Sequence, residues 1–224
     1  MPRTVPRVAA LLAALALSVP LAGCVSVVAA GVPTAIASSQ GWRENMTARQ
    51  SDSAWFGVAR VEARVWEDHA GGAGHPGKLW VYTLRAPVSP SEDDLVPRLR
   101  ERIESQARAQ GIELGRPVGD GERTLLNGFR SAWFAYNGTA SSSSGLFNRD
   151  AEVRILGEVF ACRPARTTVI VVGFAQVTDV RTVGGLVRET DRDWTTWREI
   201  ASDPSGTIED QRGSSGLAWN LVCQ

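Results

Sequence analysis

Two adjoining segments with the period of β-strands constrain the fold of this chain most. In Glu152–Cys162, alternate side chains are apolar, and the residues that share one face are Val153, Ile155, Val159 and Ala161. Arg163–Arg166 then turns the chain into Thr167–Val177 (TTVIVVGFAQV), the most apolar segment, which predicts a central strand. Strands joined by so short a turn pair antiparallel, so the chain is expected to build an antiparallel sheet.

Further strands are predicted on both sides of this pair. Trp55–Trp66 alternates, with Ala59, Val61, Ala63 and Val65 on one face. The glycine-rich turn His69–Gly77 leads into Leu79–Leu84 as the returning strand of a hairpin. Asn127-Gly128 is a hairpin signal between Arg123–Leu126 and Arg130–Tyr136. Ser141–Gly145 is expected to be a polar loop, and Leu217–Cys223 an edge strand.

Two helices are predicted to pack against this sheet. The first has apolar residues at every fourth position, namely Leu95, Leu99, Ile103 and Ala107, and Gly111 is its expected end. Pro97 fits the first turn of that helix if Asp94 is the N-cap. Asp191 or Thr190 can cap the second helix, which runs through Trp194, Trp197 and Ile200. The fold class is therefore α+β, an antiparallel sheet of about six strands with two helices packed against it.

The order of these elements resembles that of the PsbP-like family of exported domains. The resemblance lies in the helix Asp94–Gln110, in Leu125–Arg130 leading into Trp133–Tyr136, and in the closing helix around Trp194. It covers roughly residues 55–203. It implies a non-enzymatic accessory or ligand-binding domain, with no catalytic residues to carry over.

The N-terminus resembles the signal of prokaryotic lipoproteins. Arg3 and Arg7 precede the apolar run Val8–Val19, and Leu21-Ala22-Gly23-Cys24 matches the lipoprotein cleavage site. The resemblance implies cleavage before Cys24 and a lipid on its sulfur. The expected organisation is a signal peptide at 1–23, a lipid anchor and tether at 24–53, and one α+β domain at 54–224. An uncleaved membrane helix kinked at Pro20 is the alternative, and both place the domain outside the membrane.

The cysteines and the charge balance limit which functions the chain can have. If Cys24 carries lipid, Cys162 and Cys223 are expected to form a disulfide, which leaves no thiol for catalysis or metal binding. The chain has 24 basic and 24 acidic residues, and removal of the signal takes two arginines, leaving a net charge of −2. This balance argues against a nucleic-acid partner.

Few residues suggest catalysis or metal binding. The two histidines, His69 and His75, lie in the glycine-rich turn, and no Gly-x-Ser-x-Gly motif accompanies them. Their spacing fits no standard metal site, although Glu67 and Asp68 could add oxygen ligands. We therefore expect no catalytic residues, metal or cofactor. The acidic run Glu92–Asp94 is explained by the N-terminus of a helix.

An enzyme with dispersed carboxylates is a third possibility. The candidates are Glu62, Glu152 and Glu158, all on predicted strands. Alternation puts Glu152 and Glu158 on one face with Arg154 between them, and a solvated face with ion pairs is the simpler interpretation.

Eight tryptophans are many for this length, and core packing explains most of them. The alternative is an apolar or sugar-stacking pocket between sheet and helix. Asn45 and Asn137 begin N-glycosylation sequons, and such short motifs are weak evidence alone.

The leading hypothesis is a lipid-anchored, extracytoplasmic, non-enzymatic accessory or binding domain of the cell envelope. Its expected partners are the membrane, through Cys24, and an envelope protein or small ligand. The second hypothesis is a carrier of an apolar or carbohydrate ligand in a tryptophan-lined pocket.

Overall fold

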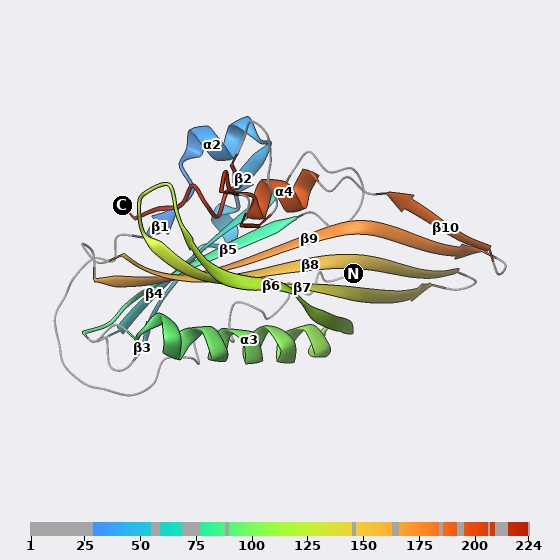
Figure 1. The fold of residues 1–224 in the computed structure, drawn as a ribbon, viewed down its shortest axis with the longest axis horizontal. Coiled ribbons are helices and arrows are strands. Elements are labelled where there is room, and N and C mark those ends of the chain that lie inside the picture. Colours follow the sequence, from blue (N-terminus) through green and yellow to red (C-terminus); the bar gives the residue numbers. More distant parts are fainter. Residues whose placement is uncertain are drawn as a thin grey trace.

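The computed structural model describes residues 29–54, 59–68, 77–87, 90–144, 147–162, 166–183, 186–191, 195–205, 207–208 and 215–223. These residues form an α+β fold in which helices cover the two faces of one antiparallel sheet (Figure 1). The predicted class is confirmed. The sheet has nine strands rather than about six, because segments before residue 55 and after residue 185 add strands.

The described elements follow one another in this order: β1 (Ala30–Gly31), α2 (Thr34–Ser39), β2 (Trp42–Glu44), the 3-10 turn η2 (Met46–Ala48), β3 (Gln50–Ala54), β4 (Ala59–Asp68), β5 (Lys78–Arg85), α3 (Glu92–Ala109), β6 (Ile112–Thr124), β7 (Arg130–Ser144), β8 (Phe147–Cys162), β9 (Thr167–Val183), β10 (Leu186–Asp191), α4 (Thr195–Ala201) and β11 (Val222–Cys223). The main sheet has the order β2-β4-β5-β9-β8-β7-β6, with β3 also on β4 and β10 also on β9. β9 lies between β5 and β8, which confirms the central strand.

Helix α3 covers one face of the sheet. Its side chains Leu95, Leu99 and Ile103 pack with residues of β7, β8 and β9, as their spacing of four residues predicts. Gly111 has a φ of 72° and follows the C-cap, so the predicted helix end is also confirmed.

The predicted start of α3 is wrong. Ser91 is the N-cap, because its hydroxyl accepts a hydrogen bond from the Asp94 amide at 3.2 Å. Pro97 therefore lies inside the helix, where it cannot donate to the carbonyl of Asp93. Both residues are exposed, so water can take the place of that bond.

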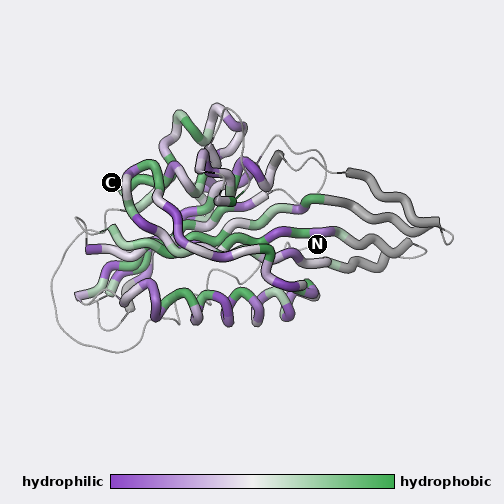
Figure 2. Tube along the Cα trace, in the orientation of Figure 1, coloured by the Kyte–Doolittle hydropathy of each residue, from purple (hydrophilic) through white to green (hydrophobic). Residues whose placement is uncertain are grey.

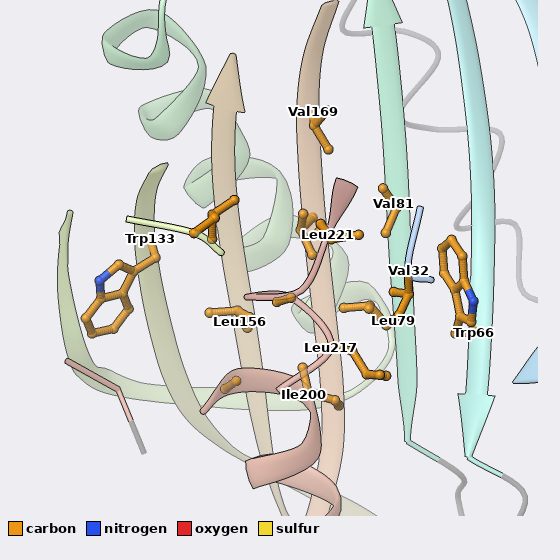
Figure 3. Close-up of a cluster of buried hydrophobic side chains, with 14 of the residues drawn as sticks. Val32, Trp66, Leu79, Val81, Trp133, Leu156, Val169, Ile200, Leu217 and Leu221 are labelled. Atoms are coloured by element: carbon orange, nitrogen blue, oxygen red, sulfur yellow. The ribbon is translucent and has the colours of Figure 1, made fainter. Parts of the chain in front are cut away.

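The opposite face of the sheet carries the larger core. It is covered by α2, α4 and the C-terminal segment, and its side chains interlock around Leu156, Ile200 and Leu221 (Figure 3). The N-terminal segment differs here from the predicted tether. Val32, Ala37 and Trp42 are buried in this core, because the apolar run before Arg43 packs on the sheet and does not extend into solvent.

The C-terminal segment is held by a disulfide. Cys162 at the end of β8 is bonded to Cys223, with their Cα atoms 6.2 Å apart, so the predicted pairing is confirmed. The tail is not an edge strand of the main sheet. Leu217–Asn220 forms turns, and β11 pairs with β1 in a separate two-stranded sheet.

Two long hairpins extend the sheet into an arm. β7 and β8 pair as far as Ser144 and Phe147, and β9 and β10 pair as far as Val183 and Leu186 (Figure 1). The loop predicted at Ser141–Gly145 is therefore strand up to Ser144, because the backbone of β7 keeps its partner β8. Thr190 and Asp191 pair with β9 and do not cap α4.

In the described part of the chain, no helix is long and apolar enough to cross a membrane. Cys24, His69, His75 and Trp194 lie outside the described residues.

Candidate functional site

A buried ionic cluster joins β6, β8 and the segment after α4. The Arg123 guanidinium donates to both carboxylate oxygens of Glu158, through Nε at 2.8 Å and Nη2 at 2.6 Å. Its Nη1 donates to the Ala201 carbonyl at 2.9 Å and to Asp203 at 3.3 Å. The side chains of all three charged residues are at most 1% exposed.

Neutral donors complete this cluster. The Ser131 hydroxyl donates to Glu158 at 2.6 Å, and the Ser205 and Thr207 amides donate to Asp203 at 2.8 and 3.3 Å. Burial alone would raise the pKa of Asp203, but the hydrogen bonds from Ser205 and Thr207 and the charge of Arg123 outweigh it and lower the pKa. Burial likewise opposes the charge of Arg123, yet Glu158 and Asp203 raise its pKa.

The cluster holds the fold together and is poorly placed for acid–base catalysis. Both carboxylates are bound by one guanidinium and enclosed, so neither is placed to exchange a proton with a substrate. The solvated outer face predicted for Glu158 is therefore wrong. Leu156 and Phe160 flank it on the same face of β8 and are fully buried, so this part of β8 is apolar on both faces. That pattern is typical of a strand covered on both sides and could have revealed the burial.

The other candidate carboxylates lie far from Glu158. Glu152 is six residues away along β8, about 20 Å at the rise of a strand, which is too far for two carboxylates to act on one bond. Glu62 lies on β4, where it pairs with Arg64 at 3.1 Å. The structure does not bring these three glutamates together.

A partly uncovered apolar surface lies beside α3. α3 packs on β6, β7 and β8, and the same face of β4, β5 and β9 carries side chains that are only half-buried. We call these the β5 surface, made by Val61, Trp80, Val172 and Phe174. Val172 is the cross-strand neighbour of Trp80 on β9, so these two side chains adjoin, while Val65 on the other side of Trp80 is buried.

Tyr82 adds one polar atom next to the β5 surface. Its side chain lies two residues along β5 from Trp80 and packs in the same cluster, and the residue is 4% exposed. Its hydroxyl makes no hydrogen bond within the described structure. Burial raises the pKa of this hydroxyl well above its usual value, so it stays neutral and can donate a hydrogen bond. The β5 surface can contact an apolar molecule, and the enclosed Tyr82 hydroxyl becomes available to an acceptor on that molecule only when neighbouring side chains move.

Four of the six tryptophans that the structure describes serve the core, as expected. Trp42, Trp66, Trp133 and Trp197 are at most 7% exposed. Trp80 and Trp219 are half-buried and lie on different faces of the sheet, so they do not form one shared pocket.

The acidic residues near the glycine-rich turn have protein partners. Glu67 pairs with Lys78 at 2.8 Å and accepts from Asn45 at 3.2 Å, and Asp68 is buried. No cluster of three or more metal-ligating side chains occurs in the ranges given above. Glu92 accepts a hydrogen bond from the Ala161 amide at 3.2 Å, which ties the start of α3 to β8.

No family model, no curated protein and no solved structure matches this chain. The resemblances to lipoprotein signals and to PsbP-like domains therefore stay predictions.

Proposed function

We propose that this protein is a lipid-anchored, extracytoplasmic accessory or binding domain of the cell envelope that acts without catalysing a reaction. The Cys162–Cys223 disulfide carries this proposal, because structural disulfides form and persist in oxidising compartments outside the cytoplasm. The lipoprotein-like segment ending at Cys24 supports it as well, since segments of this type direct export and lipid attachment.

The chemistry of the described residues supports binding more than catalysis. The carboxylates of Glu158 and Asp203 are enclosed and held by Arg123, while the β5 surface is apolar and half-buried. A protein of this kind acts by binding other molecules. The membrane, an envelope protein and a small apolar molecule are the partner classes that fit these features.

Intact mass of the protein purified from its native host tests the proposal. Cleavage before Cys24, an added acyl mass and the loss of two hydrogens from Cys162 and Cys223 are the expected results under denaturing conditions. A full-length chain without acyl groups would contradict the anchor, and two free thiols would contradict the oxidising compartment.

A carrier of an apolar ligand is the second candidate, and the unpartnered hydroxyl of Tyr82 beside the β5 surface favours it. We expect a brominated monoacylglycerol, which offers carbonyl acceptors, to quench the fluorescence of Trp80. Tyr82→Phe is expected to weaken this binding about five- to tenfold through loss of one hydrogen bond, without lowering stability.

Tyr136→Phe is the matched control for the carrier hypothesis. The Tyr136 hydroxyl already bonds to Glu104 at 2.8 Å, so this variant should lose about 1 kcal/mol of stability and keep its affinity for the ligand. Equal affinities of the two variants, or no quenching by the brominated lipid, would rule out this use of Tyr82.

A further inference from the structure

Very little chain separates Cys24 from the folded domain. Ala29 and Ala30 are 3% and 1% exposed, and the Ala30 amide donates to the Thr83 hydroxyl at 2.9 Å. The chain is therefore fixed to β5 from this point. Five residue steps lead from Cys24 to Ala29, and even a fully extended chain covers no more than about 18 Å over that length.

Helix α2 follows directly and exposes an uncharged surface. We call it the α2 surface, formed by the exposed residues Thr34, Ala35, Ser38 and Ser39. The first charged residue after Cys24 is Arg43. The hydroxyls of Ser38 and Ser39 donate to the helix carbonyls of Thr34 and Ile36, at 2.5 and 2.8 Å.

These hydrogen bonds lower the cost of removing the α2 surface from water. A hydroxyl that already donates within its helix loses less on dehydration than a free one, and no charge has to be dehydrated. α3, on the other side of the sheet, is different. It exposes Arg98, Glu101 and Arg108 and is largely hydrophilic along its outer side (Figures 1 and 2).

We propose that the α2 surface rests on the headgroup layer of the membrane that holds the lipid on Cys24, and that the short tether keeps it there. This inference rests on the lipid anchor of the proposed function. The partner is the lipid surface itself, and α3 and the β5 surface on the far face of the sheet remain accessible. A ligand or envelope protein would then approach from the side away from the bilayer.

Fluorescence quenching in vesicles tests this orientation. The full lipidated protein carries one introduced thiol, Ser38→Cys on α2 or, as matched control, Ser105→Cys on the exposed side of α3. Each thiol is labelled with a nitrobenzoxadiazole dye, and the protein is reconstituted into phosphatidylcholine vesicles that contain a headgroup spin label. We expect quenching at position 38 at least threefold stronger than at position 105.

A longer tether gives a second readout. Insertion of fifteen Gly/Ser residues between Val27 and Val28 should reduce the quenching at position 38 to the level of position 105. Equal quenching at both sites in acylated, vesicle-bound protein would overturn the orientation and leave the anchor intact. Unchanged quenching with the longer tether would overturn the role of tether length. A mass that shows no acyl group would overturn the anchor and the inference together.

Discussion

Arg123 and Glu158 are enclosed so completely that each depends on the charge of the other. Removal of one member of such a pair leaves an uncompensated buried charge, which costs far more than the pair contributes. We expect Glu158→Gln to lower the free energy of unfolding by about 3 to 5 kcal/mol, measured by urea denaturation at pH 7.

The exposed pair Arg130–Glu122 is the control for this prediction. Its side chains are 75% and 61% exposed, so solvent screens the attraction. Glu122→Gln is expected to change stability by less than about 1 kcal/mol. Similar losses of unfolding free energy in the two glutamine variants would contradict the prediction, because they would show that burial does not increase the cost of breaking the pair.

Asp203 links this cluster to acid stability. Its pKa is lower in the folded state than its ordinary value of 3.8, so the stability that it contributes is fully present above that pH. The contribution is lost as the pH falls from about 3.8 through the folded pKa. We expect the unfolding free energy of Asp203→Asn to fall less steeply with decreasing pH than that of the wild type, measured by urea unfolding between pH 2 and 6.

Asp120→Asn is the comparison for the acid limb. The Asp120 side chain is 62% exposed in its pair with Arg100, and the variant should keep the wild-type slope. A wild-type slope in Asp203→Asn would contradict the role given to Asp203.

Residue-scale prediction succeeded where partners are close in sequence or few in number. Gly128, with a φ of 81°, follows Asn127 in the predicted turn, and Cys162 had one possible partner once Cys24 was assigned to lipid. The contacts of Arg123 are with residues 35 and 80 positions away. No local spacing encodes such contacts, and each residue alone resembles a surface charge.

At the scale of the element, α3 contains one carbonyl without its helical donor. Pro97 cannot donate to the carbonyl of Asp93, and its side chain is exposed, so the ring adds little packing. We expect Pro97→Ala to raise the free energy of unfolding by about 1 to 3 kcal/mol, because alanine restores the hydrogen bond. The measurement is urea unfolding with helicity followed at 222 nm.

Arg98→Ala, at the next exposed position of α3, changes no backbone hydrogen bond and should stay within about 0.5 kcal/mol of wild type. A loss of stability in Pro97→Ala would show that the rigid ring holds the entry of the helix. The position of Pro97 could not be predicted, because Ser91 and Asp94 are both good caps and the competition between them is settled by tertiary packing.

Strand lengths were the weakest part of the element-scale prediction. Strands with alternating apolar residues, such as β4 and β8, are visible in the sequence. The end of β7 at Ser141–Ser144 has no apolar period, and it is a strand because β8 supplies its backbone partners. The α+β class could be predicted because it needs only the order and type of the elements.

At the scale of the whole molecule, the disulfide closes a loop of 61 residues. In the chain-entropy model such a bridge stabilises the folded state by about 4 kcal/mol. We expect Cys223→Ser to lose most of this amount. Hydrogen exchange should show faster exchange in β11 and β1, which form a separate two-stranded sheet within the described residues, and little change in β9.

Equal acceleration of exchange in all strands would show that the bridge supports the main sheet as well as the separate β1–β11 sheet. Reduction of the wild type without denaturant should reproduce the pattern of the serine variant, which separates loss of the bond from loss of the thiol.

The pairing of β1 with β11 also determines how the domain would bear mechanical load. Tension applied at the proposed anchor enters the fold at Ala30–Gly31, where the Ala30–Thr83 hydrogen bond leads to β5 and two residue pairs lead to β11. From β11 the force passes through the Cys162–Cys223 bond into β8, which is paired along its length with β7 and β9. A covalent bond thus joins the two-stranded sheet to the longest paired strands, so part of a pull from the membrane reaches β8 and its neighbours.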